Sequence, residues 1–459
     1  MQGNGHMLLA AAIGQWRAIV ARPAVATADL TANMQALYRS VYDTDFAVLD
    51  PDEVKRIARP AAEELFDLYL TLRDRIVEWQ AQGLMHDAAP LAVRNAMRIL
   101  RYTIDIVGEV AGGYPRLGPG ERTFRAFEGP PEWTLMHPAL RAGERPLLEA
   151  GDVLLVRGKL HNSAAIARIG DADSQFSHVG LVHVDGDGQC WLIEALIEEG
   201  SVWTPADKAL DHGLGRAVLF RHRDAALARR AAALAAGHVA RSRGVLGGRI
   251  PYDFSMELAG DDQFFCSKLV RHGFLAASGG AMTLPSFPTR LAMTNRDFFE
   301  RIGVTAVDTI APGDFEVEPA FDIVAEWRDY RVTSSIRMQD LLMSKLFDWM
   351  DAHGYRFREG FGISVLSLIG RLTSWGPDAV KNLLVLIGFP KIPSNMPART
   401  IATIGMLHGT AQPILERLLA LDAQRIETTG RPLHPREVQE ELERYRATSG
   451  SRIGYLVAP

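Results

Sequence analysis

The chain has 459 residues, of which 47% are hydrophobic and 23% are charged, which is typical of a globular protein with two or three packed units. The formal net charge is −5, and Lys and Arg form no runs interleaved with aromatic residues, so nucleic-acid binding is not expected. Two cysteines, Cys190 and Cys266, are too few for a disulfide framework and suit a reducing compartment. The first residues contain a short apolar stretch with no preceding Lys or Arg, which does not fit a signal peptide, so we expect a cytoplasmic protein.

The first region, residues 1–125, is predicted to be helical. Asp50 is a suitable N-cap for a helix with Pro51 at its first position. Apolar residues follow at spacings of three and four, as on one buried helix face: Leu65, Leu68, Tyr69, Leu72, Ile76 and Trp79. Residues 113–151 are rich in Pro, Gly and Arg, which predicts a connector and marks a boundary.

The middle region, residues 126–330, has a different period. Residues 151–158, 177–184 and 189–196 are short, rich in aliphatic residues and bounded by turn residues, which predicts strands. The last two flank the sequence DGDG and should form a hairpin. Helices are expected over residues 223–242 and from near residue 266.

The last region, residues 331–459, is again predicted to be helical, with helices over residues 338–350 and from Pro435. It also holds two apolar stretches, residues 361–370 and 382–389. Both are shorter than the roughly 18–20 residues that span a bilayer, so no transmembrane helix is expected. We expect both stretches to be buried against other helices. The alternative is a lining role in a groove or contact with a membrane surface.

The expected hairpin places a histidine and a glutamate on one face of the sheet. If the turn is centred on Gly186, His178 and Glu194 lie opposite one another. A hydrogen bond between imidazole and carboxylate would fix the tautomer of His178 and stabilise its charged form, as a general base paired with a thiol requires.

Cys266 could be a nucleophile or a small buried hydrophobic residue. Leu269, Val270 and Phe274 have helical spacing downstream, which places the thiol in the first turn of a helix. Unpaired backbone N–H groups and the helix dipole there favour a thiolate and could stabilise an oxyanion. Cys190 lies within a predicted strand, and we interpret it as a packing residue.

Five segments in order, GDVLLVRG, FSHVGLVHVD, LIEALIEEG, IPYDFSMELAGDDQFFCSKLV and APGDFEVEPAFDIVAEWRDY, resemble the circularly permuted papain-like cysteine hydrolases of the NlpC superfamily, in particular the YiiX/YebB-like group. The resemblance covers about residues 148–330. It implies an α+β fold, a permuted papain-like (NlpC-type) domain with an antiparallel sheet, flanked by N- and C-terminal helical regions. It also implies that Cys266 is the nucleophile, His178 the base and Glu194 the residue that orients the base. Tyr252, in PYDF, matches a tyrosine that contacts substrate or oxyanion. Lys268 departs from the family pattern, because an acidic residue is common there.

The remaining titratable residues suggest no cofactor. Four histidines have no carboxylate at metal-ligand spacing and lie outside any HExxH pattern, so no zinc site is expected: His161, His212, His222 and His272. No phosphate-binding loop surrounds Gly247 and Gly248.

The sequence and this resemblance together predict a cysteine hydrolase that acts through a Cys-His-Glu triad and a thioester, and the resemblance implies that it cleaves an amide bond, peptide or peptidoglycan-like. One alternative is a lipid-directed acyltransferase or phospholipase with the same triad, so the expected partner is a peptide or a lipid substrate. The other alternative is a non-catalytic binding or scaffold protein.

Overall fold

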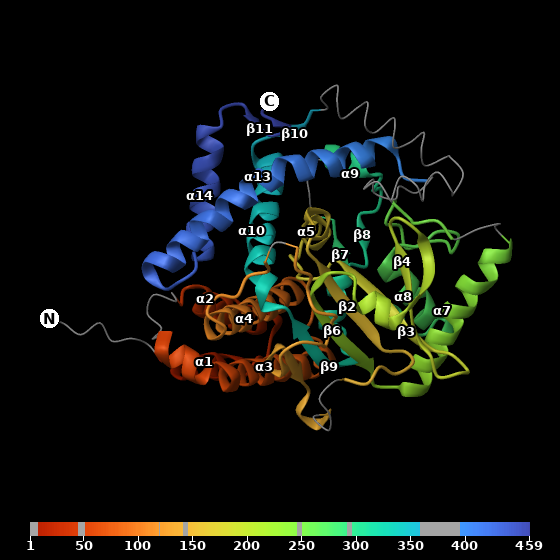
Figure 1. Ribbon diagram of the computed structural model, residues 1–459. Helices are drawn as coiled ribbons and strands as arrows, with labels where there is room; N and C mark the ends of the chain where they lie inside the picture. Colours follow the sequence, from red (N-terminus) through yellow and green to blue (C-terminus); the bar gives the residue numbers. More distant parts are fainter. Residues whose placement is uncertain are drawn as a thin grey trace.

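The computed structural model is a mixed assembly of helices and an antiparallel sheet, as the sequence predicts (Figure 1). It describes residues 8–44, 51–118, 120–140, 146–245, 250–291, 296–358 and 395–459. In Figure 1 the N-terminal helices lie to the left of the sheet and α7 to its right, and one hydrophobic cluster joins both to the same face of the sheet. The predicted division at residues 125/126 and 330/331 stays a prediction.

The helices carry the buried stripes that the sequence predicts. Their bounds are α1 Leu9–Val20, α2 Thr27–Tyr42, α3 Pro51–Ala81, α4 Ala89–Ala111, α5 His161–Arg168, α6 Ala206–Leu210, α7 Ala225–Val245, α8 Cys266–Ala277, α9 Arg296–Ile302, α10 Tyr330–Ala352, α13 Ala398–Thr429 and α14 Pro435–Thr448. All six stripe residues of α3, from Leu65 to Trp79, are buried. The expected N-cap at residue 50 lies outside the described residues, as do residues 361–370 and 382–389. Within the described ranges, no helix is both long and apolar enough to cross a membrane.

A seven-stranded sheet forms the centre of the molecule, in the order β1-β9-β6-β2-β3-β4-β5. Its strands are β1 Thr134–Met136, β2 Val153–Gly158, β3 His178–Val184, β4 Cys190–Leu196, β5 Gly200–Pro205, β6 Leu214–His222 and β9 Phe321–Arg328. All neighbouring strands are antiparallel. Short strands make two smaller sheets: β7 Thr289–Arg290 with β8 Asp308–Thr309, and β10 Arg356–Phe357 with β11 Arg452–Ile453 and β12 Leu456–Val457. Three short 3₁₀ segments complete the described elements: η1 Pro131–Trp133, η2 Pro138–Leu140 and η3 Pro312–Val317.

The β3–β4 hairpin differs from its predicted register. Leu181 pairs with Ile193, so the turn is centred on Asp187 rather than on Gly186. The reason is the side chain of Asp185, whose Oδ1 accepts hydrogen bonds from the backbone N–H groups of Asp187 and Gln189 and so closes a longer turn. The opposed pairs shift by two residues along one strand, and each side chain therefore keeps its face.

Two large hydrophobic clusters support the fold. One joins the N-terminal helices to one face of the sheet and to α8. The other joins α9, α10, α13 and α14 to α5. Helix α10, which includes the helix predicted over residues 338–350, contributes buried residues to the second cluster: Met338, Leu342, Leu346 and Trp349. A third, smaller cluster covers the opposite face of the sheet.

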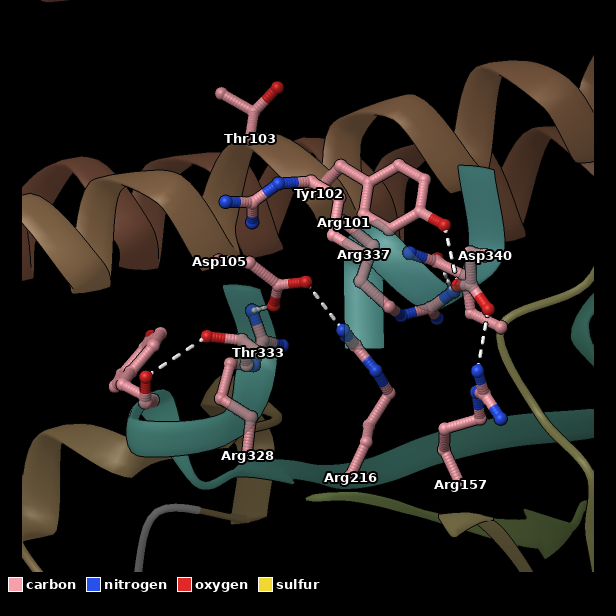
Figure 2. A network of polar contacts seen from close by, with 12 residues as sticks. Arg101, Tyr102, Thr103, Asp105, Arg157, Arg216, Arg328, Thr333, Arg337 and Asp340 are labelled. Carbon is pink, nitrogen blue, oxygen red and sulfur yellow. Dashed lines mark hydrogen bonds and ion pairs between the residues drawn. The ribbon is translucent and has the colours of Figure 1, made fainter. Parts of the chain in front are cut away.

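Buried ion pairs connect the N-terminal helices, the sheet and α10 (Figure 2). Asp105 of α4 pairs with Arg216 of β6. Asp340 of α10 lies between Arg157 of β2, at 2.6 Å, and the hydroxyl of Tyr102, at 2.7 Å. Each of these side chains is almost fully buried, so each charge depends on partners from a distant part of the sequence.

Candidate active site

Cys266 is the first residue of α8, where the sequence predicts a helix to begin. Phe265 before it has an extended backbone, with φ −97° and ψ 167°, and the chain turns into the helix at the cysteine. The thiol therefore lies at the end of the helix where backbone N–H groups lack intrahelical partners. Helix α8 packs its buried residues against β3 and β4. This packing brings the thiol to the strand that carries His178.

The expected contact between His178 and Glu194 is present. His178 Nε2 and Glu194 Oε2 are 2.7 Å apart, and Glu194 is 1% exposed. The two residues are diagonal neighbours, because the observed register places Glu194 opposite Gly180. Gly180 lies against Leu192: a Cβ built at Gly180 would lie 2.5 Å from Cγ of Leu192, closer than real contacts allow.

The site stabilises an imidazolium beside a thiolate. Burial by itself lowers the pKa of His178, but hydrogen bonds with Cys266 and Glu194, together with their negative charges, raise it to about 10. Burial also acts to raise the pKa of the Cys266 thiol. The hydrogen bond and charge of His178 outweigh this effect, and with Ser267 and the backbone of Val179 they lower the pKa of Cys266. Both changes favour the charged pair.

Tyr252 reaches the same site from the loop before α8. It forms an isolated parallel bridge with Phe264, two residues before the cysteine. Burial, with the charge of Cys266, raises the pKa of the Tyr252 hydroxyl well above its ordinary value, so the hydroxyl keeps its proton and can donate a hydrogen bond. Tyr252 and Cys266 line one cavity.

Lys268 departs from the family pattern but has a clear structural partner. Its Nζ lies 2.8 Å from Oδ2 of Asp253 and donates to the carbonyl of Ala259 at the same distance. Asp253 also accepts a hydrogen bond from the backbone N–H of Ser255 at 3.0 Å. The pair ties the first turn of α8 to the loop that carries Tyr252.

The other cysteine and the other histidines lie in different settings. Cys190 is in β4, and burial together with the charges of Asp185 and Asp152 raises the pKa of its thiol. His161 Nε2 is 2.9 Å from the side-chain oxygen of Gln412. Within the described ranges, no three His, Cys, Asp or Glu side chains come together in a group that could hold a metal ion.

An apolar cavity opens onto Cys266, and the sequence does not reveal its walls. They come from α5, from the loop of Tyr252, from residues 289–291, from α9, from residues 304–312 and from α13. The contribution of α13 is four residues on one helix face: Thr400, Thr403, Ile404 and Leu407. Their spacing can be read from the sequence as a buried stripe, but nothing in the spacing indicates that the stripe faces the cysteine.

The comparisons with known proteins concern the sheet and α8. Residues 147–325 match the model of a family described as permuted papain-like amidase enzymes, YaeF/YiiX, C92 family. This segment therefore carries a permuted papain-like domain, which confirms the resemblance and the fold class expected from the sequence. Membership of the wider NlpC superfamily stays a prediction. The chain is also similar to a solved structure described as metalloprotein yiiX from Escherichia coli O157:H7, with 20% sequence identity, coverage of 39% of this chain and 98% of that chain, and a TM-score of 0.31. A search of curated proteins gave no match.

Proposed function

We propose, starting from the permuted papain-like amidase domain at residues 147–325, that this protein is a cysteine hydrolase that cleaves an amide bond with Cys266, His178 and Glu194. The observation that carries the proposal is the raised pKa of His178 beside the lowered pKa of Cys266 at the start of a helix. Such a pair provides a nucleophile and a proton donor in one unit at neutral pH.

In the first step, the Cys266 thiolate attacks the amide carbonyl. Collapse of the tetrahedral intermediate breaks the C–N bond, and the imidazolium of His178 gives its proton to the leaving amine, which leaves a thioester. In the second step, His178 takes a proton from water, and the resulting hydroxide attacks the thioester. The C–S bond breaks, and the acid leaves while the thiolate and imidazolium form again. Glu194 keeps the imidazole oriented through Nε2 in both steps.

Two groups are placed to stabilise the oxyanion. The backbone N–H of Cys266, at the first position of α8, has no intrahelical acceptor. The protonated hydroxyl of Tyr252 lines the cavity from the opposite loop. Replacing one such donor in other enzymes lowers kcat by about 10²–10³, so Tyr252→Phe is expected to lower turnover without preventing alkylation of the thiol.

The nucleophile can be identified without knowledge of the substrate. At neutral pH, iodoacetamide should modify Cys266 before Cys190, because the pKa of Cys266 is lowered and that of Cys190 is raised. Peptide mass spectrometry of the full chain gives the two rates. Cys190→Ala is the matched control and should leave the fast reaction in place, whereas Cys266→Ala should remove it. Faster labelling of Cys190 would refute the assignment and favour the non-catalytic alternative.

A further inference from the structure

The segment that carries Tyr252 runs alongside the chain that leads into α8. The N–H of Phe264 donates to the carbonyl of Pro251 at 3.2 Å, and the N–H of Asp253 donates to the carbonyl of Phe264 at 3.1 Å. Tyr252 lies between these two bonds and pairs with Phe264 in a parallel bridge. The backbone of the tyrosine is therefore attached to the chain two residues before Cys266.

A buried ion pair makes a second attachment, on the other side of the cysteine. Lys268 lies two residues after Cys266, and its partner Asp253 directly follows Tyr252. The Nζ of Lys268 is 2.8 Å from Oδ2 of Asp253, and the two side chains are 4% and 7% exposed. Lys268 also donates to the carbonyl of Ala259 at 2.8 Å. The neighbours of the tyrosine and of the cysteine are thus joined on both sides.

The carboxylate of Asp253 is held at both of its oxygens. Oδ1 accepts hydrogen bonds from the backbone N–H of Ser255, at 3.0 Å, and from its hydroxyl. Oδ2 accepts from Lys268. Hydrogen bonds to a charged group are shorter and stronger than neutral ones, and burial strengthens them further. The aspartate therefore has one preferred side-chain position, which fixes the backbone next to Tyr252.

We propose that Lys268 and Asp253 are positioning residues, which hold the hydroxyl of Tyr252 where the oxyanion develops. The proposal rests on the proposed function and deepens it. Neither Lys268 nor Asp253 lines the cavity, so both act through Tyr252, which does. An oxyanion is stabilised by donors at about 2.7–3.1 Å from its position. A misplacement of about 1 Å can lower a rate by about 10².

The ionisation of the thiol has a separate origin. Burial acts to raise the pKa of Cys266, and the hydrogen bond and charge of His178 outweigh it. His178 lies on β3, whereas the ion pair joins α8 to the loop before it. Loss of the ion pair should therefore leave the thiolate in place and slow only the steps that form an oxyanion.

The test compares two reactions of one thiol, in the full chain with Cys190→Ala so that Cys266 is the cysteine that reacts. With 4-nitrophenyl acetate, the thiolate attacks the ester carbonyl, an oxyanion forms, the C–O bond breaks and 4-nitrophenolate leaves. With iodoacetamide, the S–C bond forms as the C–I bond breaks, iodide leaves and no oxyanion forms. The ratio of the two rates therefore measures oxyanion stabilisation without knowledge of the natural substrate.

Lys268→Met should lower the acylation rate by about 10–10²-fold and leave the alkylation rate unchanged. Tyr252→Phe should lower acylation by about 10²–10³-fold. Because Lys268 is expected to act through Tyr252, Lys268→Met should cause no further loss in the Tyr252→Phe protein. Lys345→Met is the matched control on α10: it removes a lysine from ion pairs with Asp348 and Glu443 and should change neither rate.

Lys268→Met leaves a buried carboxylate without its cation, so thermal unfolding must show that the variant is folded. Lys268→Met combined with Asp253→Asn removes both charges, which is far less costly, and should show the same loss of acylation. Equal losses of acylation and alkylation would overturn the positioning role, as would unchanged acylation in both variants. A full effect of Lys268→Met in the Tyr252→Phe protein would overturn it as well. A Cys266 thiol that is alkylated but never acylated, in a chain with Lys268 and Tyr252 intact, would instead overturn the proposed function, and the positioning role with it.

Discussion

Replacing Glu194 by Gln isolates the effect of its charge on His178. The amide oxygen of Gln can still accept the Nε2 proton across 2.7 Å, so the geometry is kept and the negative charge is lost. The imidazolium is then less stable relative to neutral imidazole, and the pKa of His178 must fall. The thiolate of Cys266 loses part of its stabilisation in turn.

The magnitude follows from the type of hydrogen bond. A bond to a charged group contributes about 1.5–3 kcal/mol and a neutral one about 0.5–1.5 kcal/mol, so the difference is about 1–1.5 kcal/mol. One pH unit corresponds to about 1.4 kcal/mol. The pKa of His178 should therefore fall from about 10 to about 9. The alkaline limb of a pH profile of turnover should move down equally, because the leaving amine needs the imidazolium proton.

NMR titration of the full chain with isotope-labelled histidine measures this pKa directly. The chain has 13 histidines, and the missing signal in His178→Asn identifies the one to follow. Glu198→Gln removes the same charge from an exposed position in the turn after β4 and is the matched control. An unchanged midpoint in Glu194→Gln, or an equal change in both variants, would refute the argument.

Two further predictions concern stability, and both can be measured by urea unfolding. Glu326 has its pKa lowered from 4.5 to about 2 by three buried arginines that outweigh the effect of its own burial; Glu326→Gln should therefore cost about 3 kcal/mol at neutral pH. A carboxylate whose pKa is lowered by folding stabilises the folded state fully only at a pH above its pKa in the unfolded chain. The difference in the free energy of unfolding between wild type and Glu326→Gln should therefore shrink as the pH falls from about 5 toward 2. A difference that stays constant over this range would contradict the prediction. Gly180→Ala places a methyl group against a side chain across the hairpin and should cost about 1–3 kcal/mol, whereas Gly186→Ala has open space and should cost less; equal losses would show that packing at residue 180 is not the cause.

The sequence predicts the elements of the site well, because their signals are local. Periodicity alone indicates the hairpin strands and the start of a helix at Cys266. The contact of His178 with Glu194 requires only that the two side chains point to the same face of the sheet. It therefore forms although the predicted turn is wrong and the carboxylate of Asp185 closes a longer loop. A shift by one residue would have separated the two side chains.

The cavity and the ion-pair network could not be predicted, because both depend on segments that are far apart in the chain. Arg101 and Arg216 look like solvated residues in the sequence, and only the fold brings both to Glu326, at 2.8 and 3.2 Å. The stripe on α13 predicts burial but does not name its partner. Periodicity gives the face of an element, whereas the partner of that face is set by tertiary packing.

The buried ion pairs have a practical consequence for any attempt to isolate the catalytic segment. Arg216 lies within the segment that matches the family and Glu326 follows its last residue, but their partners Asp105 and Arg101 lie upstream of it on α4. Cutting the chain to residues 126–330 would keep the pairs of Glu326 with Arg216 and Arg328 but remove Asp105 and Arg101, at a cost of about 3–5 kcal/mol for each broken buried pair. Several such losses approach the entire stability of a domain. Truncated chains that keep only residues 126–330 are therefore expected to be insoluble, and an expression screen should start from the full chain.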